Sequence, residues 1–187
     1  MPVISITLLP GYSAQAQQRL VRRVAIATRS VIAAPAAGTT VFVNQSSTYL
    51  RDGLVHSTGG SEQPDASALV REFLSLMQAR ELGAAAGFLA PGFVMHFPGG
   101  SSMQRLEQLV DWASSRYRSV TKDFERFDES WTAEGAVVYC SGTLRGVWLD
   151  GTAFSGIRFI DRFEIAQGLI QRQDVWNDLA LVQPAAP

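Results

Sequence analysis

The sequence is poor in the residues that form covalent cross-links and metal sites. Its 187 residues include one cysteine, Cys140, which excludes an internal disulfide bond. The two histidines, His56 and His96, are too few to complete a closed zinc site without carboxylate ligands. No apolar run approaches the roughly 20 residues of a membrane-spanning helix, and no basic residue precedes the short apolar stretch at the N-terminus, as one would in a signal peptide. We therefore expect a cytoplasmic protein with no metal, no other cofactor and no membrane partner.

The composition, with 47% hydrophobic and 18% charged residues, is typical of a soluble globular protein. The N-terminal part of the sequence has more basic than acidic residues. Four of its arginines lie in one expected helix: Arg19, Arg22, Arg23 and Arg29. No aromatic residues lie among them to stack on bases, so a solvated helix face is the better interpretation, and we expect no nucleic acid partner.

The first 55 residues have the pattern of a strand, a helix and a second strand. Residues 3–9 are β-branched and apolar, and the dipeptide Pro10-Gly11 marks a turn after them. Ser13 is a candidate N-cap for an amphipathic helix over residues 14–33, and residues 39–43 predict the second strand. Such a βαβ unit has parallel strands and is too small to cover both faces of its own sheet. We therefore expect self-association, as a dimer or a larger oligomer that could be a hexamer.

Gly, Ser and Asp are frequent over residues 52–67, which predicts a linker. We place the domains at residues 1–55 and 67–184, with the linker at 56–66. The second domain should begin with helices over residues 68–89, a strand at 93–97 and a helix over 104–117, according to the spacing of their apolar residues.

From Lys122 onward the periodicity changes to two, which predicts strands over residues 137–148, 152–165 and 169–177. Asp150-Gly151 suits a two-residue type I′ turn, and that turn would place Cys140 opposite Asp161. The face that carries this pair is otherwise apolar or small and should be the core face. Its single carboxylate is Asp161.

Asp161 is the strongest catalytic candidate of the second domain. On an apolar face desolvation disfavours its charged form, which suits it to act as a general acid or hydrogen-bond donor, although a buried structural ion pair would explain it too. A two-residue turn near Gln167 would put Asp174 opposite Asp161 and bury Trp176. A three-residue turn would put Gln173 there instead. We favour the first, in which two facing carboxyl groups would share a proton.

Three further residues could take part in binding or catalysis. His96 alternates with Phe93, Met95 and Phe97 and could serve as a base or simply lie on the surface. Tyr117 could line a pocket or belong to the core. Cys140, next to Asp161, should be a poor nucleophile because its thiolate is disfavoured there.

Pro2 would present a secondary amine if Met1 is removed. An α-amino group titrates at about 7.7–8.0, so a modest shift would make it a free base at neutral pH, able to move a proton between the carbon and the oxygen of an enol. The alternative is that Pro2 only begins a strand.

Residues 2–53 resemble the 4-oxalocrotonate tautomerase family. The similarity runs through Pro2-Val3-Ile4-Ser5-Ile6, the Gly11-Tyr12-Ser13 turn, Ala34-Pro35, the strand from Thr40 to Val43, and Tyr49-Leu50-Arg51-Asp52-Gly53. The resemblance implies that Pro2 is a general base. The family's arginine positions hold Tyr12 and Thr40 here, so Tyr12 and Arg51 are the remaining candidates for binding substrate.

Residues 66–182 resemble the nuclear transport factor 2-like (NTF2-like) superfamily, especially SnoaL-like polyketide cyclases and ketosteroid isomerase. The similarity is carried by the helix around Phe73, the segments 88–93 and 96–99, and the strands Ile160 to Ile165 and Ile170 to Asn177. The resemblance implies a cone of helices on a curved antiparallel sheet. It also implies that Asp161 donates a hydrogen bond to an enolate oxygen, that His96 lies near the position of the catalytic base, and that Phe73 takes the place of an oxyanion tyrosine.

Together these features indicate an α+β protein that carries out cofactor-independent proton transfer on a small carbonyl or enol compound, as a tautomerase, isomerase or cyclase. The catalytic candidates are Pro2, Asp161, His96 and Asp174, and the candidates for binding substrate are Tyr12, Arg51, Phe73, Tyr117 and Trp176. The alternative is a small-molecule-binding NTF2-like domain without turnover, with the N-terminal unit serving as an oligomerisation module.

Overall fold

The computed structural model describes residues 1–57, 59 and 62–182. It divides into two compact units, Met1–Gln63 and Pro64–Pro187, which we describe separately. The division lies inside the range 56–66 expected for a linker. Residues 58, 60 and 61 of that range, and residues 183–184 at the end of the expected second domain, lie outside the described part of the chain.

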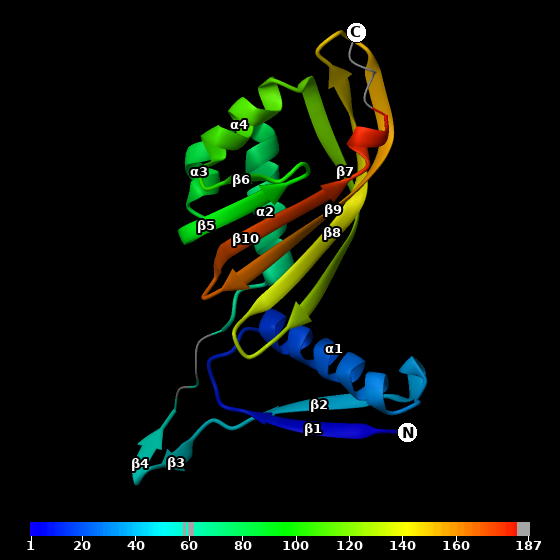
Figure 1. The fold of residues 1–187 in the computed structure, drawn as a ribbon. Helices are drawn as coiled ribbons and strands as arrows, with labels where there is room; N and C mark the ends of the chain where they lie inside the picture. The colour runs from blue at the N-terminus through cyan, green and yellow to red at the C-terminus, as the bar shows by residue number, and fades with distance from the viewer. Residues whose placement is uncertain (58, 60–61, 183–187) are drawn as a thin grey trace. The chain divides into compact units, whose positions relative to one another are not determined.

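The first unit has a two-stranded parallel sheet and one long helix (Figure 1). Strands β1 (Val3–Leu8) and β2 (Thr40–Gln45) pair in parallel, as the sequence pattern predicts, and helix α1 (Ala14–Val31) connects them through the short 3₁₀ helix η1 (Ala36–Gly38). The Ser13 side chain accepts a hydrogen bond from the Ala16 backbone and so caps the helix as expected. A hairpin of β3 (Tyr49–Arg51) and β4 (Leu54–His56), which the sequence analysis missed, follows β2.

This unit has almost no interior of its own. Among its described residues only Gly38 is buried, and α1 has no buried residue at all. Large apolar side chains are instead exposed on the sheet, at Val3 and Phe42, and on the helix, at Ile26 and Val31. Burial of apolar surface is the main favourable term in folding, so the described residues of this unit lack the core that an independent domain of this size needs.

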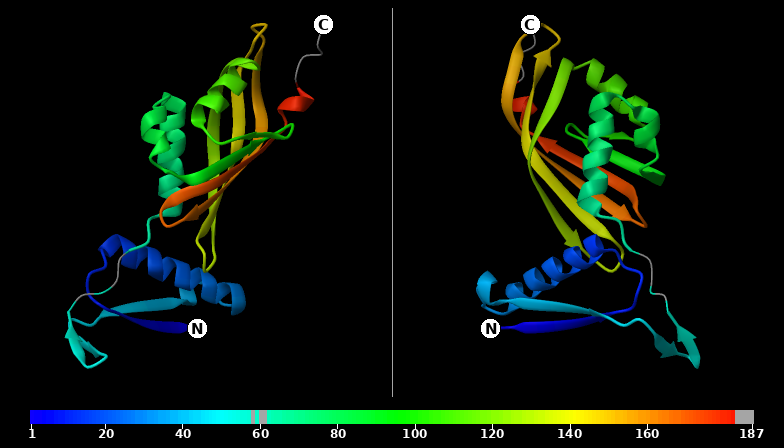
Figure 2. Two further views of the ribbon diagram at one scale, coloured as in Figure 1. Left: turned by 60° about the vertical axis from the view of Figure 1, so that its left-hand side comes forward. Right: turned by 180° about the vertical axis from the view of Figure 1, so that it is seen from behind.

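The second unit places three helices on one face of a six-stranded sheet (Figures 1 and 2). The helices are α2 (Ala66–Ala79), α3 (Leu82–Ala86) and α4 (Leu106–Ser114). Asp65 caps α2, and Arg80 ends it in the left-handed conformation with φ 61°. The second short helix expected within 68–89, over residues 84–89, is α3, which begins two residues earlier and ends at Ala86. The expected helix over 104–117 also ends early, because Tyr117 already begins a strand.

The sheet is mixed, with strand order β6-β5-β10-β9-β8-β7. Its strands are β5 (Leu89–Phe97), β6 (Ser101–Met103), β7 (Tyr117–Trp131), β8 (Ala136–Trp148), β9 (Ala153–Ala166) and β10 (Leu169–Asn177), followed by the 3₁₀ helix η2 (Leu179–Leu181). The expected all-antiparallel sheet is wrong at one position, since β10 pairs with β5 in parallel. That pairing places His96 beside Asp174.

The β8–β9 hairpin has the predicted register but not the predicted turn. Cys140 lies opposite Asp161, and the predicted core face of the hairpin is buried. A type I′ turn needs positive φ at both central residues, but only Gly151 of the pair Asp150-Gly151 has it, with φ 97°. A register shift near Gly156, whose φ is 72°, compensates for the different turn.

The β9–β10 hairpin has the expected two-residue turn but not the expected facing pair. Gln167 and Gly168 both have positive φ, and Ala166 pairs with Leu169. A bulge between Ile170 and Arg172 then shifts the register by one residue. Val175, and not Asp174, therefore lies opposite Asp161.

Candidate functional site

A cavity of about 140 Å³ lies between the helices and the core face of the sheet in the second unit. Side chains from α2, α4, η2 and strands β5 and β7 to β10 line it. Most of the wall is apolar, and its aromatic members are Phe73, Phe97, Trp112, Tyr117, Phe124 and Phe159. Two of the residues predicted to bind substrate, Phe73 and Tyr117, are thus brought together here.

The polar end of the cavity is organised by a buried ion pair. The Lys122 ammonium on β7 contacts Oδ2 of Asp161 on β9, two strands away, and lies 4.6 Å from the centroid of the Phe159 ring. Gln173 Nε2 donates a hydrogen bond of 3.2 Å to the same carboxylate oxygen. Lys122 and Gln173 line the cavity, and Asp161 lies behind them with no exposed surface.

One oxygen of this carboxylate has no partner. Asp161 Oδ1 is buried and makes no hydrogen bond with any residue in the described part of the chain. A buried, unpaired carboxylate oxygen is costly, and such groups are commonly retained at catalytic sites. The predicted role of Asp161 in the chemistry of the core face therefore has a physical basis beyond the ion pair.

Burial changes the acidity of two neighbouring groups. Desolvation, reinforced by the negative charge of Asp161, raises the pKa of the Cys140 thiol to about 12, so this cysteine is a poor nucleophile at neutral pH. Burial also raises the pKa of Tyr117 and outweighs the opposing charges of Arg116 and Arg80. Tyr117 therefore faces the cavity as a neutral phenol that can donate a hydrogen bond.

Lys122 is the main residue of the cavity that the sequence analysis did not identify. A signal was present, because Lys122 is the only lysine in a chain whose 16 basic residues are otherwise all arginines. The alternation of polar and apolar residues did not predict that Lys122 lies on the core face, because β7 shifts its register against β8 twice along its length.

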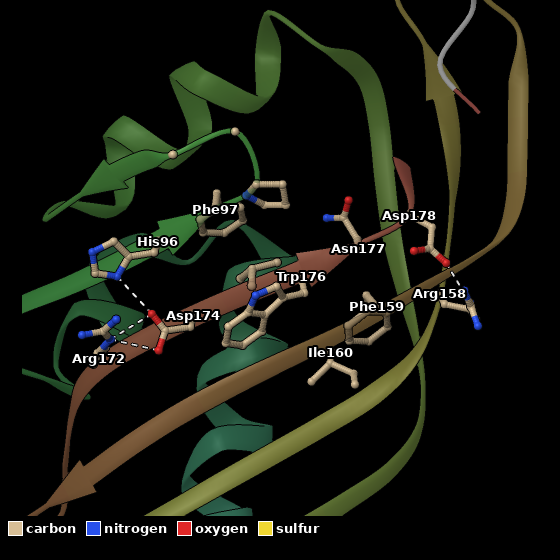
Figure 3. A pocket seen from close by; sticks show the side chains of 14 residues that line it. His96, Phe97, Arg158, Phe159, Ile160, Arg172, Asp174, Trp176, Asn177 and Asp178 are labelled. Atoms are coloured by element: carbon tan, nitrogen blue, oxygen red, sulfur yellow. Dashed lines mark hydrogen bonds and ion pairs between the residues drawn. The ribbon is translucent and has the colours of Figure 1, made fainter. Parts of the chain in front are cut away.

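The other two catalytic candidates of this unit lie on the opposite face of the sheet (Figure 3). His96 Nδ1 is 3.0 Å from Asp174 Oδ1, Arg172 Nε donates to both carboxylate oxygens at 2.8 and 2.9 Å, and Arg162 donates to Oδ2 at 3.1 Å. Although Asp174 is on the outer face, these partners leave it only 5% exposed.

A shallow groove of about 810 Å³ runs along this outer face, past His96, Asp174 and Trp176. Trp176 is 54% exposed, so its expected place in the core is wrong. The reason is the bulge at the start of β10, which turns Gln173 and Val175 inward and Asp174 and Trp176 outward. For the same reason Asp174 does not lie beside Asp161, and His96 lies on the outer face because Phe93 and Met95, with which it alternates on β5, are buried in the core.

The candidates of the first unit are also separated within one chain. Pro2 lies at the start of β1, where its carbonyl accepts a hydrogen bond from the Thr40 backbone. Tyr12 follows the end of β1, and Arg51 lies in β3, where it stacks on the Tyr49 ring at 5.6 Å. Six residues of strand span roughly 20 Å, so neither Tyr12 nor Arg51 completes a site around Pro2 in a single chain.

Among residues 1–57, 59 and 62–182 there is no cluster of three histidine, cysteine or acidic side chains able to hold a metal ion. No helix in the same part of the chain is long and apolar enough to cross a membrane.

Comparisons with known proteins identify the second unit. The family model of the SnoaL-like domain matches residues 70–173. No curated protein matches the chain in sequence.

Several solved structures share its fold. An NTF2-like protein of unknown function from Burkholderia pseudomallei has 16% identity and a TM-score of 0.55, over 64% of this chain and 95% of that one. A protein provisionally named a polyketide cyclase, from Pseudomonas putida, has 16% identity and a TM-score of 0.52, over 66% of this chain and all of that one. TerC, co-crystallised with polyporic acid, has 11% identity and a TM-score of 0.53, over 62% of this chain and 93% of that one. At these identities the likeness shows an α+β NTF2-like fold.

The Asp174 cluster predicts a pH dependence of stability. Burial raises the pKa of Asp174, but hydrogen bonds and charges from Arg172, with Arg162 and His96, outweigh it and hold the pKa below its ordinary value. The stabilisation is therefore present above the unfolded-state pKa of about 3.9 and is lost as the pH falls through the lower folded-state pKa. We expect Asp174→Asn to cost roughly 1–3 kcal/mol at pH 7, and the difference from wild type to shrink below about pH 4.

Urea unfolding followed by tryptophan fluorescence measures this effect in the second unit alone, because all four tryptophans lie there. Asp128→Asn is the matched control, since Asp128 pairs with Arg126 on the exposed surface and should change stability by less than about 1 kcal/mol. A stability difference between Asp174→Asn and wild type that stays constant down to pH 2 would contradict the assignment.

Proposed function

The chain belongs to the family of SnoaL-like domains, and on that premise we propose that its cavity carries out cofactor-independent proton transfer on a small carbonyl or enol compound. The reaction would be that of a tautomerase, an isomerase or a cyclase. The observation that supports it is the pair of Lys122 and Asp161 at the polar end of an otherwise aromatic cavity.

The two charged groups have separate tasks in this reaction. A carbonyl oxygen at the polar end accepts a hydrogen bond from the Lys122 ammonium, and the interaction strengthens as the oxygen becomes an enolate. Because most of the cavity wall is apolar, this charge stabilisation is worth more than it would be in solution. Asp161 serves as the base that takes the proton from the adjacent carbon and returns it, and the side chains of Lys122 and Gln173, which lie in front of it, would shift to give its carboxylate access to the cavity. Tyr117 and Gln173 supply further donors.

The volume of the cavity restricts the compound. A cavity of about 150 Å³ lined by apolar side chains accommodates benzene. The present cavity, of about 140 Å³, therefore fits a compound with a single ring better than a steroid or a fused tetracycle. The flat aromatic walls favour a ring or a conjugated enone.

The alternative is an NTF2-like domain that binds a small molecule without turnover. The same ion pair favours it in one respect, because a buried carboxylate needs a cationic partner for purely structural reasons. Binding without proton exchange would identify this function.

Exchange of the α-hydrogens of cyclohexanone in D₂O, followed by proton NMR, tests the proposal. Wild-type protein should accelerate the exchange, and Lys122→Met should lower the acceleration by about 100-fold or more, the typical effect of removing an oxyanion donor. Asp161→Asn should also lose the acceleration of exchange, because the substitution removes the base.

Arg126→Met is the control, since it removes a cation of the exposed surface. It should exchange like wild type. Equal exchange rates for Lys122→Met and wild type would contradict the proposal, and saturable binding of cyclohexanone by wild type without exchange would support the alternative.

For the first unit we propose a tautomerase-like assembly in which copies of the chain associate. The exposed apolar side chains on its sheet and helix support this, as does the absence of buried side chains from its described residues. After removal of Met1, the Pro2 amine would be the base for enol substrates, and a second copy would bring Tyr12 or Arg51 toward it.

Ketonisation of phenylpyruvate, with removal of Met1 checked by intact mass, tests this second role. Pro2→Ala should lose the activity, because the ring amine is gone, yet should sediment as the same oligomer as wild type. A monomer at all concentrations would contradict the assembly. Retention of Met1, or equal activity in Pro2→Ala, would contradict the role of Pro2.

A further inference from the structure

Lysine occurs at a single position in this sequence. One of its 16 basic residues is a lysine, and that residue is Lys122. Arginine pairs with carboxylates at least as well as lysine does, but in proteins it does not lose its proton, so it does not become a nucleophile. Lys122 is therefore the one side chain of this sequence that can act as an amine.

Lys122 brings an amine to an apolar cavity beside a carboxylate that can take its proton. Its side chain is 23% exposed and lines the cavity, and its Nζ contacts only Asp161 Oδ2 and the face of the Phe159 ring among the described residues. Lysines desolvated in apolar pockets form Schiff bases with carbonyl compounds. Asp161 is fully buried beside it and has a second oxygen free to carry a proton.

We propose that Lys122 captures the carbonyl carbon of a small aldehyde or ketone as an imine, with Asp161 moving the protons. This inference rests on the proposed function for its substrate class and goes beyond it by making the intermediate covalent.

The sequence of steps balances without any co-reactant. The Lys122 ammonium passes one proton to the Asp161 carboxylate, and the free amine attacks the carbonyl carbon. A C–N bond forms, and the oxygen takes a proton from the nitrogen to give a carbinolamine. Asp161 then donates its proton to the hydroxyl group, the C–O bond breaks, and water leaves. The product is a protonated imine that pairs with the Asp161 carboxylate.

Occupation of the cavity favours the first of these steps. A compound that fills the cavity expels water, and the cost of keeping two separate charges in an apolar site then rises. Proton transfer to Asp161 turns the ion pair into a neutral amine and a neutral acid, which lowers that cost. The protonated imine formed later also acidifies the adjacent C–H, so this route leads to the same proton transfer at carbon.

Reductive trapping tests the proposal directly. The full chain is incubated with cyclohexanone and sodium cyanoborohydride, and peptides are mapped by mass spectrometry. The chain has one lysine, so a side-chain adduct is assigned without ambiguity, and free Nα-acetyllysine in the same mixture is the unactivated reference amine. We expect one cyclohexyl group on Lys122, added at least about 10-fold faster than on Nα-acetyllysine. Asp161→Asn should slow the labelling of Lys122 to the rate of Nα-acetyllysine.

Benzene provides a matched control, because it has the size of the cavity but no carbonyl group. It should slow the labelling of Lys122 and leave that of Nα-acetyllysine unchanged. Labelling of Lys122 no faster than that of Nα-acetyllysine, or unaffected by benzene, would overturn the inference.

The two proposals fail separately. Exchange at the α-carbon of cyclohexanone without trapping on Lys122 would overturn the imine and leave proton transfer in place. Rapid trapping without exchange would support the imine and overturn the proposed proton transfer.

Discussion

The arrangement of the second unit depends on one buried carboxylate. Asp161 lies on the apolar face of β9 with no exposed surface, and an isolated charge there would be strongly unfavourable. Lys122 of β7 and Gln173 of β10 compensate for it, so three strands converge on one oxygen atom. Their convergence gives the aromatic cavity a single polar end. It also leaves the second carboxylate oxygen without a partner in the described part of the chain, which a purely structural ion pair would not require.

The two faces of the sheet separate two kinds of chemistry. The bulge at the start of β10 sends Gln173 toward Asp161 and sends Asp174 to the outer face, where His96 and two arginines surround it. On the outer face the charges are balanced and the groove is open. On the inner face the cavity is small and one cation stands beside one carboxylate, the setting in which a charge on a reacting oxygen is stabilised most effectively.

Much of the fold could be predicted, because strands and helices follow from periodicity. Alternation along the β8–β9 hairpin placed Cys140 opposite Asp161 even though the turn has another conformation, since the apolar face specifies the register more strongly than the turn does. The bulge after Ile170 leaves no signal in the alternation, and the predicted facing of Asp161 and Asp174 failed for that reason. Phe73 and Tyr117, which were predicted to bind substrate, line the cavity. Lys122 could have been found from its rarity, but its orientation depends on tertiary packing.

The central claim is that Lys122 and Asp161 form one ion pair at the cavity. Because Lys122 is the only lysine, labelling with ¹⁵N-lysine gives a single side-chain ammonium signal in NMR spectra of the full chain. The account predicts that this signal remains visible at neutral pH, since a buried, hydrogen-bonded ammonium exchanges its protons slowly with water, and that Asp161→Asn shifts or broadens it. A signal that exchanges as rapidly as that of free lysine and does not respond to Asp161→Asn would contradict the account.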